Sequence, residues 1–272
     1  MDDKVIAGRV ALVTGASRGL GAAIAARLAR AGAHVALSAR TLESDARGAG
    51  SLRETVEAIA AAGGLAVPFQ ADLAKPEDRR RLVADATEQL GPVDILVNNA
   101  AVTYLGPVGE WSEKRWRLMF EVQARAPFEL TELVLPGMRE RKRGWILNIS
   151  SRSATHPVGP PYEHLHADGG WAVYGMCKAA LNRFSTALAA EVYAQGIAVN
   201  SLAPWDNVAT PGAGTHELVD GFALEGPEWV AEAALALCSG PPELTGRVAY
   251  SQPLLAELGL RPAPAASPAS PG

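Results

Sequence analysis

Short apolar runs alternate with longer segments of helical character along most of the chain. The apolar runs occupy residues 9–14, 35–37, 66–69, 94–97, 144–149, 197–201 and 246–250. Between them, apolar residues at helical spacing predict helices near 21–31, 51–62, 76–90, 112–138, 172–194 and 227–238. Continuous apolar runs joined by helices are typical of parallel strands buried on both faces. The pattern predicts an α/β fold, a single Rossmann-type doubly wound domain with an about seven-stranded parallel sheet and helices on both faces.

Residues 1–260 show no shift in composition that would mark a second domain, and one α/β core of this size is ordinary. We therefore expect one domain over this range. The segment 261–272 consists mainly of proline, alanine and serine and lacks bulky apolar side chains that could pack. We expect it to be a disordered tail.

Composition narrows the class of protein. Hydrophobic residues make up 48% of the chain, which is typical of a globular protein, and the net charge of -4 gives no reason to expect a nucleic-acid partner. The acidic start, Met1-Asp2-Asp3-Lys4, does not resemble a secretory signal, and no apolar run reaches the roughly 18 residues of a membrane span. Cys177 and Cys238 show no disulfide or zinc spacing, so we expect a cytoplasmic protein without a metal or a membrane partner.

A glycine-rich turn follows the first predicted strand, with the sequence Thr14-Gly15-Ala16-Ser17-Arg18-Gly19-Leu20-Gly21. Glycines at a strand-to-helix junction let backbone amides approach a pyrophosphate, and the helix N-terminus adds partial positive charge there. The alternative is a tight turn without a ligand. Its place at the first strand–helix junction favours a dinucleotide site, and we expect contacts from Gly15, Ser17, Arg18, Gly19, Leu20 and Gly21.

The residue at the end of the second strand indicates which dinucleotide is bound. An NAD site normally has an acidic side chain there, about 20 residues after the glycines, to bind the ribose 2′-hydroxyl. This chain has Ala39 at that position, followed by Arg40, while Arg18 lies inside the glycine turn. Two guanidinium groups would bind a 2′-phosphate through charge-assisted hydrogen bonds. We expect NADP(H) to be preferred, with NAD(H) as the alternative cofactor.

Several further motifs occur in a fixed order along the chain. They are Asp72-Leu73 after the third strand, Asn98-Asn99-Ala100-Ala101 after the fourth, Ser150-Ser151 after the fifth, and Tyr174-Gly175-Met176-Cys177-Lys178 on the next helix. Together with the Thr-Gly-x-x-x-Gly-x-Gly turn, they resemble the classical short-chain dehydrogenase/reductase family. The resemblance extends over about residues 6–258 and implies that family's Rossmann-type fold and hydride-transfer activity.

The resemblance also implies roles at the cofactor. Asp72 and Leu73 would contact the adenine ring, while Asn98 and Ala100 would stabilise the sheet and line the cofactor. Lys178 would bind the nicotinamide ribose. A further group, Pro204, Val208 and Thr210, would lie at the nicotinamide carboxamide.

Tyr174 and Lys178 stand at i and i+4 of a predicted helix, which places both side chains on one face. A nearby ammonium and a positively charged nicotinamide would lower the pKa of a phenol towards neutrality, so that Tyr174 exchanges a proton with a carbonyl oxygen. By resemblance, Ser151 would orient the substrate oxygen. Cys177, within the same motif, is interpreted as a packing residue.

The sequence departs from the family pattern in four places. Gln123 stands where the family usually has an asparagine that holds a proton-relay water, and glutamine either preserves this relay or loses it. Ala101 replaces the last glycine of its motif. Trp205 replaces the glycine after Pro204 and either walls the substrate pocket or packs within its loop. The segment 153–171 is a histidine-containing insertion on the substrate side.

These observations favour an NADP(H)-dependent oxidoreductase that acts on a carbonyl or secondary alcohol, with Tyr174 as proton donor or acceptor. The first alternative is a nicotinamide-binding regulatory or structural protein on the same fold. Another Rossmann-type enzyme, such as a methyltransferase, leaves Tyr174 and Lys178 unexplained. A 3-oxoacyl thioester, a steroid, a sugar and a polyketide ketone remain open as substrates. By resemblance, helices 112–138 and 172–194 would pair in a homodimer or homotetramer.

Overall fold

A computed structural model describes residues 4–44, 50–162, 170–208 and 224–262. Its main sheet has seven parallel strands in the order β3-β2-β1-β4-β5-β6-β9. The strands are β1 (Val10–Thr14), β2 (His34–Ala39), β3 (Leu65–Gln70), β4 (Ile95–Asn98), β5 (Gly144–Ile149), β6 (Ile197–Ala203) and β9 (Val248–Tyr250). The predicted doubly wound α/β sheet is confirmed. Its order reverses between β1 and β4, where such sheets bind ligands.

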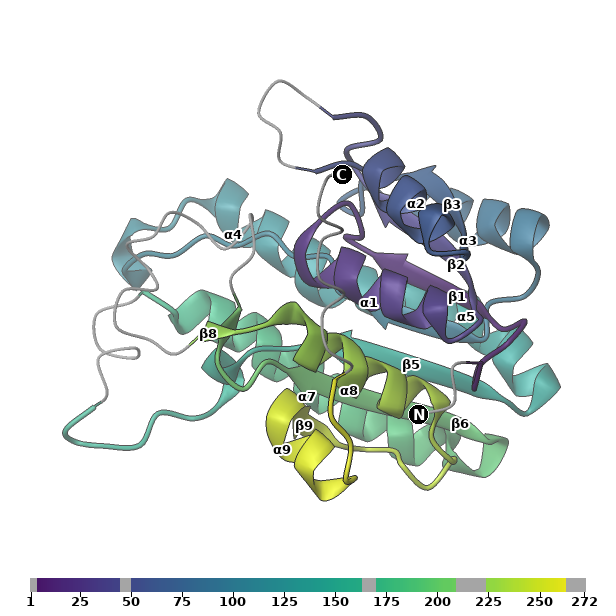
Figure 1. Ribbon diagram of the computed structural model, residues 1–272. Coiled ribbons are helices and arrows are strands. Elements are labelled where there is room, and N and C mark those ends of the chain that lie inside the picture. Colours follow the sequence, from purple (N-terminus) through teal and green to yellow (C-terminus); the bar gives the residue numbers. More distant parts are fainter. Residues whose placement is uncertain (1–3, 45–49, 163–169, 209–223, 263–272) are drawn as a thin grey trace, which may run out of the picture.

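Helices cover both faces of the sheet (Figure 1). One face carries α1 (Gly19–Arg30), α2 (Leu52–Ala61), α8 (Pro227–Ser239) and α9 (Ser251–Glu257). The other carries α3 (Pro76–Leu90), α5 (Ala126–Arg141) and α7 (Ala172–Val192). Within the described ranges, no helix is both long enough and apolar enough to cross a membrane.

Alternate residues of each central strand pack into the two core layers. Ala11 and Val13 of β1 face the layer beneath α1 and α8, whereas Val10 and Leu12 face the layer beneath α3, α5 and α7. All five residues of β1 are buried. This explains why β1 reads as a continuous apolar run, because a strand covered on both faces has no exposed side.

The structure divides the helix predicted at 112–138. It consists of α4 (Glu113–Phe120), a π-helical turn η2 (Glu121–Arg125) and α5. The apolar spacing continues through this turn, so the pattern gave no sign of it. Single π-helical turns inside helices often occur at functional sites.

Three elements escaped the sequence pattern because they are short. The strands β7 (Asn207–Val208) and β8 (Leu224–Glu225) form a separate parallel pair, and α9 follows β9 directly. The remaining short elements are the 3₁₀ turns η1 (Val108–Glu110), η3 (Arg152–Ala154) and η4 (Tyr193–Gln195). Of the insertion expected at 153–171, residues 163–169 lie outside the described residues, as does the expected tail from residue 263 onward.

Candidate active site

The glycine turn after β1 is closely packed against the loop after β4. Gly15 has φ +67°, and a Cβ there would lie 2.8 Å from Cα of Ala100. A Cβ at Gly21 would collide with the carbonyl oxygen of Gly15. Gly19 also has positive φ, at +57°. These positions require glycine, because a side chain would force the turn and the neighbouring loop apart.

Side chains on β1 and after β4 hold this turn in place. The Thr14 hydroxyl donates to the carbonyl of Val97 at 3.2 Å and accepts from the amides of Asn99 and Ala100 at 3.0 and 3.1 Å. The Asn99 amide group donates to the carbonyl oxygens of Thr14 and Gly15 at 2.9 and 3.2 Å. The shape of the turn is therefore set before any ligand binds. Neither Thr14 nor Asn99 was singled out as a site residue from the sequence.

Helix α1 begins in this glycine turn, so its N-terminus lies at the turn. Its N-cap residue is Arg18, whose side chain makes no capping hydrogen bond to the helix, and its first turn has no acidic residue. The first amides of a helix need acceptors and carry partial positive charge. An anionic group such as a phosphate would satisfy both requirements.

A cavity of about 660 Å³ lies along the carboxyl ends of the strands. The glycine-turn end is lined by Gly15, Ser17, Arg18, Gly19, Leu20, Gly21, Arg40, Asp72, Leu73 and Ala100, all of them predicted from the sequence. The opposite end is lined by Ser151, Tyr174, Lys178 and Pro204, which were also predicted. The fold brings both predicted groups to one elongated cavity. Its size suits a small-molecule or cofactor site.

Both arginines proposed to read the 2′-position stand at this cavity. Arg18 and Arg40 are exposed and contribute to its lining, together with Ala39 at the end of β2. The backbone at Arg40 is held by the side chain of Gln70, which donates to its carbonyl oxygen at 2.8 Å. The glycine-turn end of the cavity wall therefore contains two positively charged side chains, and position 39 carries no acidic side chain.

Tyr174 lies on the first turn of α7. Its hydroxyl group lies near the side chains of Ser151 and Thr103. Burial raises the pKa of Tyr174 to about 12, although these two side chains act in the opposite direction. The sequence predicted a lowered pKa for Tyr174. In the protein without a cofactor the pKa is raised, because desolvation of the phenolate outweighs the lowering effects. At neutral pH this phenol carries its proton.

Lys178 follows one turn later and is only 3% exposed. Its Nζ donates to the carbonyl oxygen of Ile149 at 2.8 Å, at the end of β5. Burial lowers the pKa of Lys178 to about 8. The side chain is fixed at the cavity wall and is poised to change charge near physiological pH.

Ser151 is brought close to Tyr174 by tight packing between η3 and α7. Gly175, next to Tyr174, lies so near η3 that a Cβ there would collide with the carbonyl oxygen of Ser153. The Ser151 Oγ accepts hydrogen bonds from the backbone amide and the hydroxyl of Ser153, at 3.2 and 3.0 Å. Glycine at position 175 permits α7 to approach η3. The distances between Ser151, Tyr174 and Lys178 therefore depend on this glycine.

Three of the predicted residues do not line the cavity. Asn98 is buried and donates to Asn148 Oδ1 at 2.9 Å, within the sheet. Gln123 lies in η2 and donates to the carbonyl oxygen of Val102 at 2.8 Å, while its own Oε1 is buried without a partner among the described residues. Val208 lies in β7 and packs at the edge of the core. Thr210 lies outside the described residues.

Trp205 packs within its loop. Its ring meets Tyr250 edge-on, with centroids 5.8 Å apart, and its backbone amide donates to Oε2 of the buried Glu225 at 2.8 Å. Ser251 donates to the same carboxylate. Burial raises the pKa of Glu225 despite these hydrogen bonds. Trp205 is not among the cavity-lining residues, although its neighbour Pro204 is.

Sequence reasoning missed part of the cavity wall. Thr103, which lies near Tyr174, and Val102, Leu118 and Val122 also line it. The first two come directly after the Asn-Asn-Ala-Ala motif, and proximity to that motif is the one signal that could have drawn attention to them. In the part of the chain that the structure describes, no group of three His, Cys, Asp or Glu side chains could hold a metal ion.

The sequence also matches a family model described as short chain dehydrogenase, over residues 9–215. The chain belongs to the short-chain dehydrogenase/reductase family. This family of oxidoreductases accounts for the order in which the motifs occur and for the sheet that brings them together.

The chain is 38% identical over 199 residues to a short chain dehydrogenase of Pseudocercospora fijiensis, covering 72% of this chain and 59% of that protein. It is 31% identical to hydroxysteroid dehydrogenase-like protein 2 of Xenopus tropicalis, covering 94% of this chain and 60% of that protein. The chain therefore spans about three fifths of these relatives. A solved metagenomic short-chain oxidoreductase in complex with NADP is similar at TM-score 0.72 and 32% identity, with 90% of this chain and 97% of that chain covered.

Proposed function

We propose that this protein transfers a hydride between NADP(H) and a carbonyl or secondary alcohol substrate. The observation that carries the proposal is the arrangement of one cavity. At one end, Tyr174 lies beside Ser151 and the buried Lys178. At the other end stands a glycine turn that leads into the N-terminus of α1.

The residues present fit a dinucleotide phosphate. The glycines let the turn pack closely against the loop after β4, and the amides of α1 would bind the pyrophosphate. Arg18 and Arg40 would bind a ribose 2′-phosphate, and Ala39 offers no carboxylate to repel it. The solved metagenomic relative holds NADP, which supports the same choice here. NAD(H) is the alternative cofactor.

The side chains at the far end would handle the proton and the substrate oxygen. When bound, the nicotinamide supplies or accepts the hydride. Ser151 would donate a hydrogen bond to the substrate oxygen and orient it. Tyr174, which is protonated at neutral pH, would donate its proton to that oxygen during reduction. Lys178 would bind the nicotinamide ribose and stabilise the phenolate that remains on Tyr174.

The second candidate is a nicotinamide-binding protein of regulatory function with little turnover. One observation favours this regulatory candidate. The side-chain amide of Gln123 donates a hydrogen bond to the carbonyl oxygen of Val102, and Gln123 does not line the cavity, where a proton-relay residue would be expected. A binding protein, however, has no need of Ser151, Tyr174 and Lys178 together at one end of the site. We therefore favour the enzyme, and we propose that it works in the cytoplasm as a homodimer or homotetramer.

Binding and turnover together test the proposal. Titration calorimetry with NADP⁺ and NAD⁺ should show tighter binding of NADP⁺, and NADPH should be consumed with at least one member of a panel of 3-oxoacyl thioesters, steroid ketones, sugars and aliphatic ketones. Binding without consumption across the panel would favour the regulatory candidate. Binding of neither nucleotide would contradict both.

A further inference from the structure

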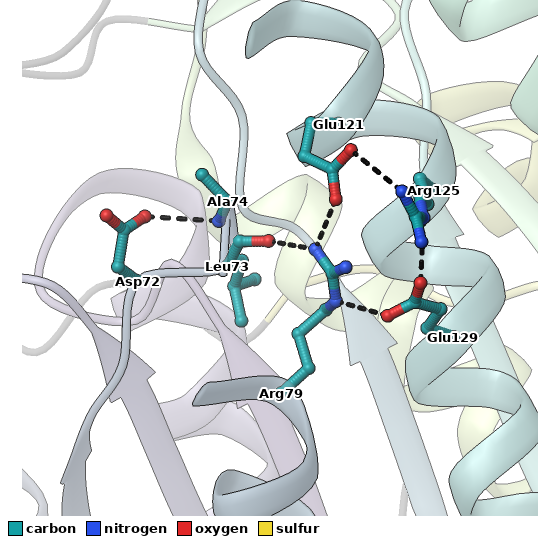
Figure 2. A network of polar contacts seen from close by, with 7 residues as sticks. All are labelled: Asp72, Leu73, Ala74, Arg79, Glu121, Arg125 and Glu129. Atoms are coloured by element: carbon teal, nitrogen blue, oxygen red, sulfur yellow. Dashed lines mark hydrogen bonds and ion pairs between the residues drawn. The ribbon is translucent and has the colours of Figure 1, made fainter. Parts of the chain in front are cut away.

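A buried arginine lies between the loop at one end of the cavity and the π-helical turn η2 (Figure 2). Arg79, in the first turns of α3, is fully buried, although Arg80 and Arg81 beside it are exposed. Its guanidinium donates to the carbonyl oxygen of Leu73, a residue of the cavity wall. A buried charge of this kind is costly unless every neighbour compensates it.

Two carboxylates on the next helical segment supply that compensation. Arg79 forms ion pairs with Glu121 of η2 at 2.8 Å and with Glu129 of α5 at 2.6 Å. Arg125 closes the group from outside, at 3.6 Å from Glu121 and 2.8 Å from Glu129. Two positive and two negative side chains therefore form one network. Hydrogen bonds from Arg79 and Arg125 lower the pKa of Glu129, even though burial acts in the opposite direction.

The loop held by Arg79 is also fixed from its other side. Asp78, next to Arg79 on α3, accepts from the backbone amide of Asp72 at 2.8 Å, and Asp72 itself accepts from the amide of Ala74 at 3.1 Å. Asp72 and Leu73 both line the cavity. The first turn of α3 thus sets the position of this loop through one amide and one carbonyl.

The carboxylate side of the network leads towards the catalytic end. Glu121 begins η2, which also contains Val122, a cavity-lining residue, and the buried Gln123. The η2 turn packs against α7, the helix that carries Tyr174 and Lys178. A displacement of η2 would therefore move Val122 in the cavity wall and change the contacts of η2 with α7.

We infer that Arg79 is a positioning residue that couples the adenine-side loop, Asp72–Leu73, to the η2 turn beside the catalytic helix. The inference rests on the proposed function, since it assigns the adenine half of the cofactor to that loop. Binding of the adenosine half then favours the arrangement of Glu121 and η2 that holds Val122 and Gln123 in place. In return, the η2 turn supports the loop that binds adenosine, because coupling of this kind is reciprocal.

The decisive variant is Glu121→Gln, which alters the network on η2 without touching the adenine-side loop. Calorimetry with adenosine 2′,5′-bisphosphate measures binding at the adenine end, independently of turnover. Arg79→Lys should weaken this binding about tenfold, because lysine cannot serve the carbonyl and both carboxylates at once. Glu121→Gln should weaken the binding of adenosine 2′,5′-bisphosphate about threefold, because its effect reaches the loop only through the Arg79 guanidinium.

A matched control separates coupling from loss of stability. Arg27 of α1 and Glu232 of α8 form a similarly buried pair at 2.6 Å, and neither lines the cavity. Arg27→Lys should lower the melting temperature without changing the binding of adenosine 2′,5′-bisphosphate. Hydrogen exchange adds a readout that needs no ligand: the amides of residues 71–75 should exchange faster in Glu121→Gln than in the unmodified chain.

The possible outcomes are distinct. Weaker binding and faster exchange in Glu121→Gln, with neither change in Arg27→Lys, support the inference. Unchanged binding and exchange in Glu121→Gln would overturn it, even if Arg79→Lys fails to fold. If the unmodified protein binds no adenosine 2′,5′-bisphosphate while Glu121→Gln still speeds exchange at 71–75, the mechanical link stands and the proposed cofactor site is what fails.

Discussion

The Nζ atom of Lys178 lies 5.7 Å from the centre of the Tyr174 ring, one helical turn further along α7. Among the described residues, no carboxylate forms an ion pair with this ammonium, and its hydrogen-bond acceptor is the carbonyl oxygen of Ile149. The lysine therefore sits in a buried, weakly compensated position next to the proposed acid. Its charge is available to act on the phenol and on a bound ribose.

This position predicts a pH dependence of stability. The pKa of Lys178 is lowered to about 8 in the fold, so between about pH 8 and pH 9 the unfolded chain holds a proton that the folded chain releases. Lys178 by itself should raise the free energy of unfolding by about 1 kcal/mol over this interval. The raised pKa values of the buried Cys177 and Cys238 thiols act in the opposite direction over the same interval, because the thiols of an unfolded chain titrate at about pH 8.5.

Urea unfolding at several pH values measures this contribution as the difference between the unmodified chain and Lys178→Met. Between about pH 8 and pH 9, the change in the free energy of unfolding should be about 1 kcal/mol less favourable in Lys178→Met. Lys114→Met should keep the pH dependence of the unmodified chain, because Lys114 is exposed on α4. An unchanged pH dependence in Lys178→Met would show that Lys178 does not contribute.

The glycine turn predicts a strong response to one methyl group. Gly21→Ala places a Cβ against the carbonyl oxygen of Gly15 and the side chain of Asn99. We expect a loss of about 1–3 kcal/mol in the free energy of unfolding, and loss of NADP⁺ binding measured by calorimetry. Gly109→Ala is the control, since nothing lies within 4 Å of a Cβ at that position. Full NADP⁺ affinity in Gly21→Ala would contradict the proposed pyrophosphate site.

The cofactor choice is tested at the end of β2. Ala39→Asp introduces the carboxylate that would bind a ribose 2′-hydroxyl and repel a 2′-phosphate. The ratio of the dissociation constants for NADP⁺ and NAD⁺ should shift about tenfold or more towards NAD⁺. Ala39→Asn has nearly the same shape without the charge and should shift the ratio much less. An equal shift in both variants would show that size, and not charge, controls this end of the site.

Glu225 predicts a second pH effect, of opposite sign. Its pKa is raised in the fold, chiefly by burial, so the stability associated with its protonated form is lost as the pH rises above the ordinary carboxyl range. Glu225→Gln keeps an acceptor for the amides of Trp205 and Asp206, and its NH2 group would donate to the Ser251 hydroxyl, which donates to Glu225 in the unmodified chain. This variant should remove the loss. Glu225→Ala should cost about 1–3 kcal/mol by removing that acceptor.

Denaturant unfolding from mildly acidic to neutral pH compares these variants. Glu243→Gln, at an exposed position, should behave like the unmodified chain. If Glu225→Gln keeps the full pH dependence, the buried carboxylate is not its source.

The sequence predicted the strands and the glycine turn because their physical requirements are local. A strand buried on both faces must be apolar throughout, and Gly15 and Gly21 stand where no side chain fits. Both ends of the cavity followed from motifs whose order is that of a known family. These motifs follow neighbouring strands, so the parallel sheet places them together at one edge.

Other features depend on contacts that the sequence does not display. The run Arg79-Arg80-Arg81 gives no sign of which guanidinium is buried, since this is decided by Glu121 and Glu129 about 40 to 50 positions away. The π-helical turn is likewise invisible in the apolar spacing. Asn98 was expected both to stabilise the sheet and to line the cofactor; its amide donates to Asn148 within the sheet, and it does not line the cavity.

The central claim is that Tyr174 supplies the proton, and Tyr174→Phe tests it most directly. Phenylalanine keeps the ring that packs edge-on against Trp171 at 5.7 Å and removes only the hydroxyl. With a carbonyl substrate that the unmodified protein reduces, kcat should fall about a hundredfold or more while the dissociation constant for NADPH stays within about twofold. An unchanged kcat in Tyr174→Phe would contradict the account.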